Sequence, residues 1–214
     1  MIYNKQSKYI FVAGAPGSKW SSVCKNIYFS PDIDRSDARP HWEYWHDAPG
    51  QLELMHMGAY FDPGMESDLP EYINFFGRES LEAMFDEPFQ SDNNGIRIIK
   101  SHIFCNHIPF LRKTWPDCPV IMVYRPDDAC LGWWVKCGHF DITYPLYHKY
   151  YVDLKTMAQR IAEQNANLRG NDEFARQFGM KDNIELCQEL GISEPGPEYR
   201  QNYNLSDISV RVTS

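Results

Sequence analysis

Three apolar runs separate the more polar stretches of the chain and predict buried strands. The first is YIFVAGA at 9–15, the second is IRIIKSH at 96–102, and the third is PVIMVYR at 119–125. The first run is apolar at nearly every position, and the others have apolar residues at their centres, as is typical of buried strands. A Pro-Gly-Ser turn follows the first run and an Asp-Asn-Asn-Gly turn precedes the second, which supports these boundaries.

Apolar residues at helical spacing occupy much of the chain between and after these runs. Trp20, Val23 and Ile27 lie on one face of the first such segment, directly after the Pro-Gly-Ser turn. Helices are predicted at 20–29, 78–86, 127–140, 146–168, 172–179 and 181–190, with Gly191 ending the last. Strands that alternate with helices predict an α/β fold of three layers, in which a parallel sheet has helices on both faces.

Residues 31–77 show no sustained period and are rich in Pro, Gly, Asp and aromatic residues. An irregular insert of this length is often functional. Its aromatic residues between 41 and 61, including HWEYWH, either line an acceptor pocket or form a lid on the core. The chain has no internal repeat, so we expect one domain over 1–214. The Pro-, Asn- and Ser-rich tail from Glu194 contributes no predicted element.

Charge and composition narrow the classes of function. The chain has 214 residues, of which 43% are hydrophobic, enough for a sizeable core. Its formal net charge of -8 argues against a general nucleic-acid binder, because binding to the phosphate backbone requires a basic surface. No apolar run of about 18 residues is present and the N-terminus lacks the layout of a secretory signal. We therefore expect a cytoplasmic protein without a membrane span.

The six cysteines are scattered without a CxxC pair, which favours free thiols in a reducing compartment. His102, Cys105 and His107 lie close together in the sequence, but their spacing matches no zinc pattern and no fourth ligand is evident. We therefore predict no metal site.

A candidate anion site lies in the loop GAPGSKWSS at 14–22, between the first strand and the first helix. Backbone N–H groups and the helix dipole at such a junction can hold a phosphate or a similar anion. The loop departs from the nucleoside-triphosphatase pattern GxxxxGK[ST], because Lys19 stands where glycine belongs and Trp20 stands where lysine belongs. The alternative is a tight strand-to-helix turn without a ligand.

Cationic residues follow the other two predicted strands. Lys100 and His102 alternate along the second strand and would point the same way, while Arg125 directly follows the third. Because the carboxyl ends of parallel strands meet at one edge, these residues and the loop are expected to converge there. A guanidinium can bind a phosphate with two hydrogen bonds, and an imidazole can move a proton. The alternatives are an ion pair of Arg125 with Asp127 or Asp128, and a purely structural role for His102.

Three of these segments, in this order, resemble the sulfotransferases that use 3′-phosphoadenosine 5′-phosphosulfate (PAPS) as donor. PGSKWS at 16–21 is similar to the family's PKSGTT loop, which wraps the 5′-phosphosulfate. KSHI at 100–103 is similar to KTHLP, whose histidine is the catalytic base and whose lysine stabilises charge in the transition state. VIMVYRPDDACLGWW at 120–134 resembles the strand, arginine and helix that bind the 3′-phosphate. The resemblance covers roughly residues 9–140.

The resemblance implies a fold like that of P-loop nucleoside triphosphate hydrolases. It implies transfer of a sulfuryl group from PAPS to a hydroxyl or amine of a small-molecule acceptor, without a metal ion. His102 is then the general base, with Lys100 and Lys19 meeting the charge of the leaving group. The implied donor-binding residues are Pro16, Gly17, Ser18, Lys19, Trp20, Ser21, Ser22 and Arg125. Trp20 either stacks on the donor's adenine or is buried in the core.

The chain departs from the family at three points. Gly17 stands where the family has its lysine, Gly132 falls where it has a serine, and no glycine- and lysine-rich donor loop follows Gly191. These departures keep open a non-catalytic nucleotide- or anion-binding module of the same fold. A small-molecule kinase that uses the loop for ATP is the second alternative.

Overall fold

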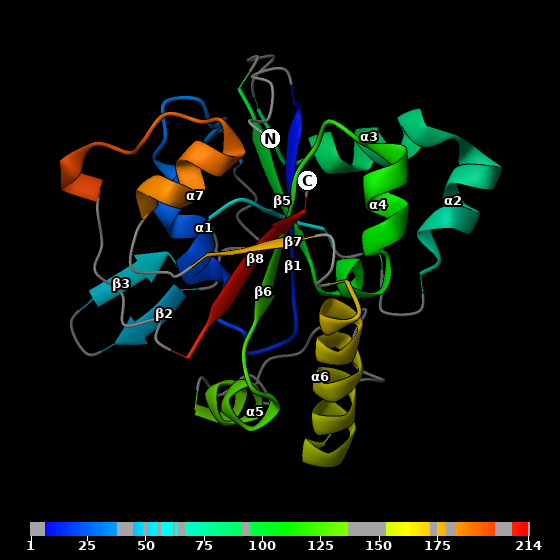
Figure 1. Ribbon diagram of the computed structural model, residues 1–214, viewed down its shortest axis with the longest axis vertical. Coiled ribbons are helices and arrows are strands. Elements are labelled where there is room, and N and C mark those ends of the chain that lie inside the picture. The colour runs from blue at the N-terminus through cyan, green and yellow to red at the C-terminus, as the bar shows by residue number, and fades with distance from the viewer. Residues whose placement is uncertain are drawn as a thin grey trace.

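A computed structural model describes residues 7–37, 45–48, 51–54, 57–61, 63, 67–90, 95–136, 153–171, 175–178, 183–199 and 207–213. Its helices are α1 (Trp20–Tyr28), α2 (Leu69–Phe76), α3 (Arg78–Asp86), α4 (Ile108–Thr114), α5 (Asp127–Lys136), α6 (Leu154–Arg169) and α7 (Asn183–Leu190), with the 3₁₀ helices η2 (His102–Asn106) and η5 (Pro197–Tyr199). Figure 1 shows a central sheet with helices to either side of it, and α5 and α6 at one end.

Six strands form the central sheet within the described residues. They are β4 (Ala59–Tyr60), β5 (Arg97–Ser101), β1 (Tyr9–Gly14), β6 (Val120–Tyr124), β8 (Ser209–Thr213) and β7 (Ala175–Phe178), in this spatial order. The first four are parallel, whereas β8 is antiparallel to both of its neighbours. A separate antiparallel hairpin pairs β2 (Trp45–Ala48) with β3 (Gln51–Leu54). The fold is α/β with a mostly parallel sheet, and the three predicted strands are confirmed as β1, β5 and β6.

Alternate residues of β1 face two different hydrophobic clusters. Ile10 and Val12 pack with residues of α1 and α7, and Tyr9 and Phe11 pack with residues of α3 and α4. All four side chains are fully buried. Helices therefore cover both faces of the sheet at this strand, which explains why its sequence is apolar at successive positions rather than at every second one.

A third cluster lies beyond the carboxyl end of β1. Ala15, in the loop after that strand, packs with Cys130 and Trp134 of α5 and with Met157 and Ile161 of α6. In Figure 1 these two helices lie at the end of the sheet where β6 leads into α5. The loop that follows β1 is therefore enclosed by α5 and α6, which positions the candidate site.

Four of the predicted helices are confirmed as α1, α3, α5 and α7; α1 ends one residue early, and the predicted start of α7, at 181–182, lies outside the described residues. The predicted end of α5, at 137–140, lies outside the described residues. The long helix predicted from 146 begins at Leu154, because the side chain of Asp153 accepts a hydrogen bond from the N–H of Thr156 at 2.7 Å and caps it. Residues 146–152 lie outside the described part of the chain.

The helix predicted at 172–179 is wrong, since Ala175–Phe178 forms strand β7. Its backbone pairs antiparallel with β8, so that Ala175 lies opposite Thr213 and Phe178 opposite Val210. β8 comes from the tail, for which no element was predicted. The secondary structure of this segment depends on pairing with a strand far along the chain, and local periodicity does not contain that information.

The region expected to be irregular, 31–77, contains regular elements in its described part. These are the β2–β3 hairpin, β4 and α2. Asp68 caps α2 by accepting a hydrogen bond from Glu71 N at 3.0 Å, and Gly77 ends it with a φ of 83°. The short helices α4 and η2 were also missed. Across the described residues, no helix has the length and apolar character needed to cross a bilayer.

Candidate functional site

The loop after β1 makes a tight turn into α1. Ser18 N donates to Ala15 O at 3.0 Å, and Ser22 N donates to Lys19 O at 2.9 Å. Lys19, at the N-cap of α1, has a φ of 60°, and it is the one non-glycine residue with a positive φ in the described part of the chain. Such a conformation is uncommon for a residue with a side chain and often marks a functional segment.

Gly17 brings this loop into direct contact with α5. Its φ is 79°, and a Cβ placed on it would lie 2.0 Å from the carbonyl oxygen of Cys130. No side chain fits there without moving the backbone of one segment. This contact gives a physical reason why position 17 is a glycine.

The guanidinium of Arg125 lies against the same loop. Its Nη1 donates to Gly17 O at 3.1 Å, while Nε and Nη2 lie 2.6 and 2.5 Å from Oδ2 of Asp207. Burial raises the pKa of Asp207, but the hydrogen bonds and charge of Arg125, with the charge of Lys19, outweigh this and lower the pKa overall. Arg125 therefore reaches the edge expected from the sequence, where Asp207 is its ion-pair partner.

The two aspartates that sequence reasoning offered as partners of Arg125 have other roles. Asp127 accepts a hydrogen bond from Nδ2 of Asn165 at 2.6 Å, and Asp128 accepts one from Ala129 N at 2.9 Å. Asp128 thus stabilises the start of α5, and Asp127 stabilises the contact of α5 with α6.

Lys19 completes a group of charges around one indole ring. Its Nζ lies 4.0 Å from Oδ1 of Asp207 and 4.7 Å from the centre of the Trp133 ring. The Arg125 Cζ lies 5.9 Å from the centre of the same ring. We call Lys19, Arg125, Trp133 and Asp207 the cation cluster. Sequence reasoning missed Trp133, although it directly follows Gly132 in the quoted segment, and Asp207, for which the tail offered no signal.

His102 is tied to the other side of the loop. Its Nδ1 lies 2.6 Å from Gly14 O, and because a carbonyl only accepts, Nδ1 carries the proton and Nε2 is the basic nitrogen of the neutral ring. The imidazole stacks on the indole of Trp20, with ring centres 4.1 Å apart and planes 8° apart. Tyr60 of β4 meets it edge-on at 5.8 Å. Three contacts therefore fix the orientation of this ring.

Trp20 and His102 are both buried, and their stacking identifies the role of the indole. Of the two roles expected for Trp20, burial in the core agrees with its place in the cluster that contains β1. In this position the indole supports the imidazole of His102.

Lys100 is fully buried on the α1 side of β5. Its Nζ has no hydrogen-bond partner among the residues that the structure describes, and burial lowers its pKa against the opposing effects of Cys24 and Asp37. The strand ends at Ser101 and His102 begins η2, so strict alternation does not extend to the histidine. The lysine and the imidazole nevertheless both face α1. Lys100 lies near Cys24 and His102 stacks on Trp20, and these two residues of α1 are one helical turn apart.

The remaining predicted donor-binding residues lie in the loop and the first turn of α1. Pro16, Ser18 and Ser21 are buried, and Ser22 is half-buried. The Ser18 Oγ has no hydrogen-bond partner within the described residues. The structure thus brings the loop together with Lys19 and Arg125 on one side and with His102 on the other, while Lys100 lies beneath α1.

The residues weighed as a metal cluster do not gather. Cys105 is buried, and Nε2 of His107 lies 3.3 Å from Ser67 O. No group of three His, Cys, Asp or Glu side chains suited to a metal ion occurs in the part of the chain that the structure describes. Five of the six cysteines are described and have free thiols; Cys137 lies outside the described residues.

No protein-family model matches this chain, and neither the curated proteins nor the solved structures include a significant match to it.

Proposed function

We propose that this protein is a sulfotransferase that moves a sulfuryl group from PAPS to a hydroxyl or amine of a small-molecule acceptor. The observation that carries the proposal is the hydrogen bond from Nδ1 of His102 to Gly14 O, at 2.6 Å. It ties a basic imidazole to the loop that would hold the donor. The parallel order β5-β1-β6, with this loop directly after the central strand, supports a fold like that of P-loop nucleoside triphosphate hydrolases.

Donor binding would use the loop and the cation cluster. The 5′-phosphosulfate would lie at the N-terminus of α1, where backbone N–H groups and the helix dipole favour an anion. The 3′-phosphate would take the place of the Asp207 carboxylate on Arg125, because a guanidinium presents the same pair of donors to either group. Lys19 would then contact the donor from the N-cap of α1.

His102 would act as general base on the acceptor. Its Nε2 takes the acceptor proton while the acceptor oxygen or nitrogen forms a bond to sulfur, and the bond from sulfur to the bridging phosphate oxygen breaks. Adenosine 3′,5′-bisphosphate leaves with the negative charge, which Lys19 and Lys100 stabilise. General-base catalysis of this kind contributes about 10²- to 10⁴-fold in rate. The Nζ of Lys100 has no hydrogen-bond partner in the described part of the chain, which supports this role, since an anion nearby would offset its burial.

The test compares ligands by thermal unfolding and then measures turnover. Adenosine 3′,5′-bisphosphate at 100 times its Kd should stabilise the protein by about 2.7 kcal/mol, and ATP at equal concentration should stabilise it less. His102→Ala should lose transfer of ³⁵S-sulfate from PAPS to a panel of alcohols and amines but keep binding of the bisphosphate. His107→Ala is the matched control and should retain turnover. Stabilisation by ATP with Mg²⁺, and not by the bisphosphate, would refute the proposal in favour of a kinase.

A second candidate, a non-catalytic nucleotide- or anion-binding module, is favoured by one specific observation. Asp207 already neutralises Arg125 and approaches Lys19, which lowers the net positive charge of the cation cluster. This candidate predicts that the bisphosphate binds but that PAPS is not turned over. His102→Ala should then leave the affinity for the bisphosphate unchanged. Transfer to any acceptor that depends on His102 excludes it.

A further inference from the structure

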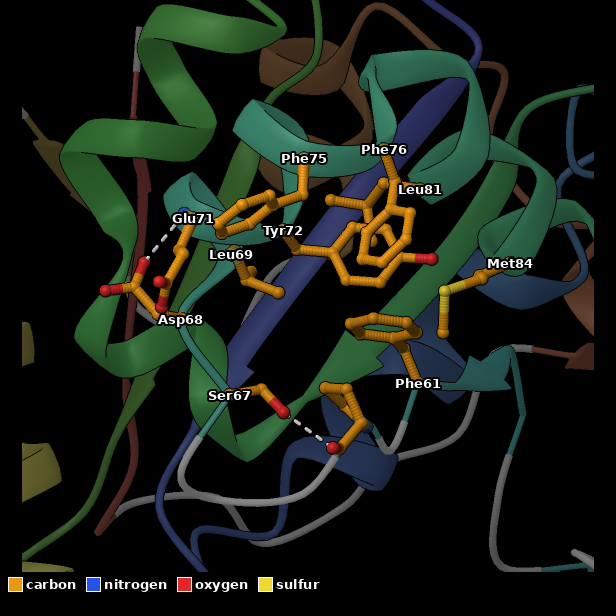
Figure 2. A pocket seen from close by; sticks show the side chains of 11 residues that line it. Phe61, Ser67, Asp68, Leu69, Glu71, Tyr72, Phe75, Phe76, Leu81 and Met84 are labelled. Atoms are coloured by element: carbon orange, nitrogen blue, oxygen red, sulfur yellow. Dashed lines mark hydrogen bonds between the residues drawn. The ribbon is translucent and has the colours of Figure 1, made fainter.

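A pocket of about 340 Å³ lies between α2, α3 and the end of β4, apart from the site described above (Figure 2). Phe61 lines it and packs against Phe85 and Phe104 on the α3 side of the sheet. The preceding residue, Tyr60, contacts Trp20 and His102. Tyr60 packs against the hydrophobic cluster on the α1 side and Phe61 belongs to the cluster on the α3 side, so the pocket and His102 lie on different sides of the sheet.

Four aromatic side chains, those of Phe61, Tyr72, Phe75 and Phe76, line this pocket. Phe75 is 74% exposed and Phe76 is 64% exposed, the two largest exposures among the big hydrophobic residues in the described part of the chain. Tyr72 and Phe76 have ring centres 4.9 Å apart. Figure 2 shows the rings of Phe75, Tyr72 and Phe76 side by side, with Phe61 below them and Met84 at one end. Exposed aromatic residues grouped around a cavity are typical of a binding site.

The electrostatic surroundings of the pocket are negative. Asp68 and Glu71 both line it, and Figure 2 places them at the end opposite Met84, beside the ring of Phe75. The segment 67–90 contains six acidic residues and one basic residue, Arg78, whose Nε pairs with Glu82 at 2.7 Å. This charge disfavours an anionic lipid surface or a nucleic acid as the occupant and favours a cation.

We propose that this pocket binds a small organic cation with apolar substituents, of the quaternary-ammonium type. The faces of the aromatic rings attract such a group electrostatically, and Glu71 with Asp68 supplies opposite charge at the same end. Leu69, Leu81 and Met84 accommodate the apolar part of the ligand. The volume is at the lower end of the range of about 300 to 1,000 Å³ for small-molecule sites. The site is independent of the proposed sulfuryl transfer.

The experiment uses the ε-methyl group of Met84 as reporter, in protein labelled with ¹³C-methyl methionine. The probe is benzyltrimethylammonium, and the control ligand is neopentylbenzene, which has the same shape without the charge. We expect a saturable shift of the Met84 resonance with the cation, an unchanged resonance of the core residue Met122, and at least roughly threefold weaker binding of the neutral ligand. Equal affinity for the two ligands, or no shift at Met84, would overturn the proposal.

Two substitutions at exposed positions extend the test without endangering the fold. Phe75→Ala should weaken binding of benzyltrimethylammonium about tenfold, and Glu71→Gln should weaken it roughly threefold while leaving neopentylbenzene unaffected. The matched controls are Val135→Ala, at an exposed apolar residue of α5, and Glu79→Gln, at a carboxylate of α3 outside the pocket. If Phe75→Ala binds the cation as tightly as Val135→Ala, and Glu71→Gln binds it as tightly as Glu79→Gln, the cation binds elsewhere and the assignment fails.

Discussion

Two buried cations at the same end of the sheet, Arg125 and Lys100, have opposite surroundings. Arg125 makes two contacts to the Asp207 carboxylate and a third to Gly17 O. Lys100 is fully buried, and its Nζ has no hydrogen-bond partner among the residues that the structure describes. A paired and hydrogen-bonded cation is tolerated in a protein interior, whereas an unpaired ammonium group costs stability.

This difference divides the candidate site into two halves, the cation cluster with Arg125 and the region beneath α1 with Lys100. In the cation cluster, the protein supplies its own anion, so a ligand must displace Asp207 before it can bind. Beneath α1, no described residue hydrogen-bonds to the Nζ of Lys100, and burial lowers the pKa of the ammonium group against the electrostatic effect of Asp37. If both cations serve one donor, the cation cluster around Arg125 determines the affinity for the donor. Lys100 then stabilises the negative charge that develops on the leaving group during transfer. The predictions below test this division, beginning with the largest expected effect.

The first prediction concerns the contact that holds the loop on α5. Gly17→Ala should destabilise the protein by more than about 3 kcal/mol, because it combines a positive φ with a Cβ only 2.0 Å from Cys130 O. Gly132→Ala is the control: nothing lies within 4 Å of its added Cβ, and alanine should stabilise α5 by about 0.5 to 1 kcal/mol. Unfolding in urea measures both. Similar values for the two variants would show that the loop does not depend on this contact.

The second prediction tests the cost of the unpaired cation. Lys100→Met should raise the free energy of unfolding by roughly 1 to 3 kcal/mol, because it removes a buried charge and retains the packing. It should also reduce sulfuryl transfer at least tenfold, if the proposed role holds. The control Lys8→Met removes an exposed ion pair with Asp86 and should lower stability by less than about 1 kcal/mol. A Lys100→Met protein that is less stable than the wild type would indicate that Nζ has a strong partner.

The same substitution has a characteristic dependence on pH. In the folded state the pKa of Lys100 lies below its ordinary value of 10.5, so the unfolded chain binds more protons between the two pKa values. Stability contributed by this residue therefore rises with pH across that window and is constant below it. The difference in unfolding free energy between Lys100→Met and the wild type should shrink as the pH is raised towards 10.5. A difference that is independent of pH would contradict burial of a charged ammonium group.

The third prediction concerns competition by Asp207. Asp207→Asn keeps the shape of the side chain and removes its charge, so it should tighten binding of adenosine 3′,5′-bisphosphate by roughly three- to tenfold. Stability should fall by less than about 1 kcal/mol, since the carboxylate is partly exposed. Calorimetric titration measures the affinity, with Asp117→Asn, before the start of β6, as control. Weaker binding by Asp207→Asn would show that the carboxylate organises the site instead of occupying it.

The centre of the fold could be predicted because its signal is local. β1 and β6 are apolar at successive positions, β5 has the apolar pair Ile98 and Ile99 at its centre, and each strand adjoins a turn or a helix that the sequence marks clearly. The edge strands could not be predicted in this way. Residues 175–178, with the sequence ARQF, have no strand pattern of their own and pair with the last strand of the chain. Such pairing depends on contacts between distant segments.

The candidate site shows the same limit. The position of Arg125 followed from the end of its strand, because the carboxyl ends of parallel strands share one edge. Its partner did not follow, since the nearby Asp127 and Asp128 engage Asn165 and Ala129, while Asp207 arrives from the tail. The stacking of Trp20 on His102 likewise brings together α1 and η2, which are far apart in the sequence.

The smallest expected effect distinguishes the two halves most directly. Gly132 lies on α5, at the position where the proposed resemblance to sulfotransferases would place a serine, and its added Cβ would meet no atom within 4 Å. Gly132→Ser and Gly132→Ala should therefore both stabilise the helix, by about 0.5 kcal/mol for serine and slightly more for alanine. Only the serine adds a hydrogen-bond donor. If a phosphate binds at the cation cluster, Gly132→Ser should bind adenosine 3′,5′-bisphosphate roughly two- to fivefold more tightly than Gly132→Ala. Equal affinities would mean that the ligand does not reach α5, so that only the loop and the residues beneath α1 hold it.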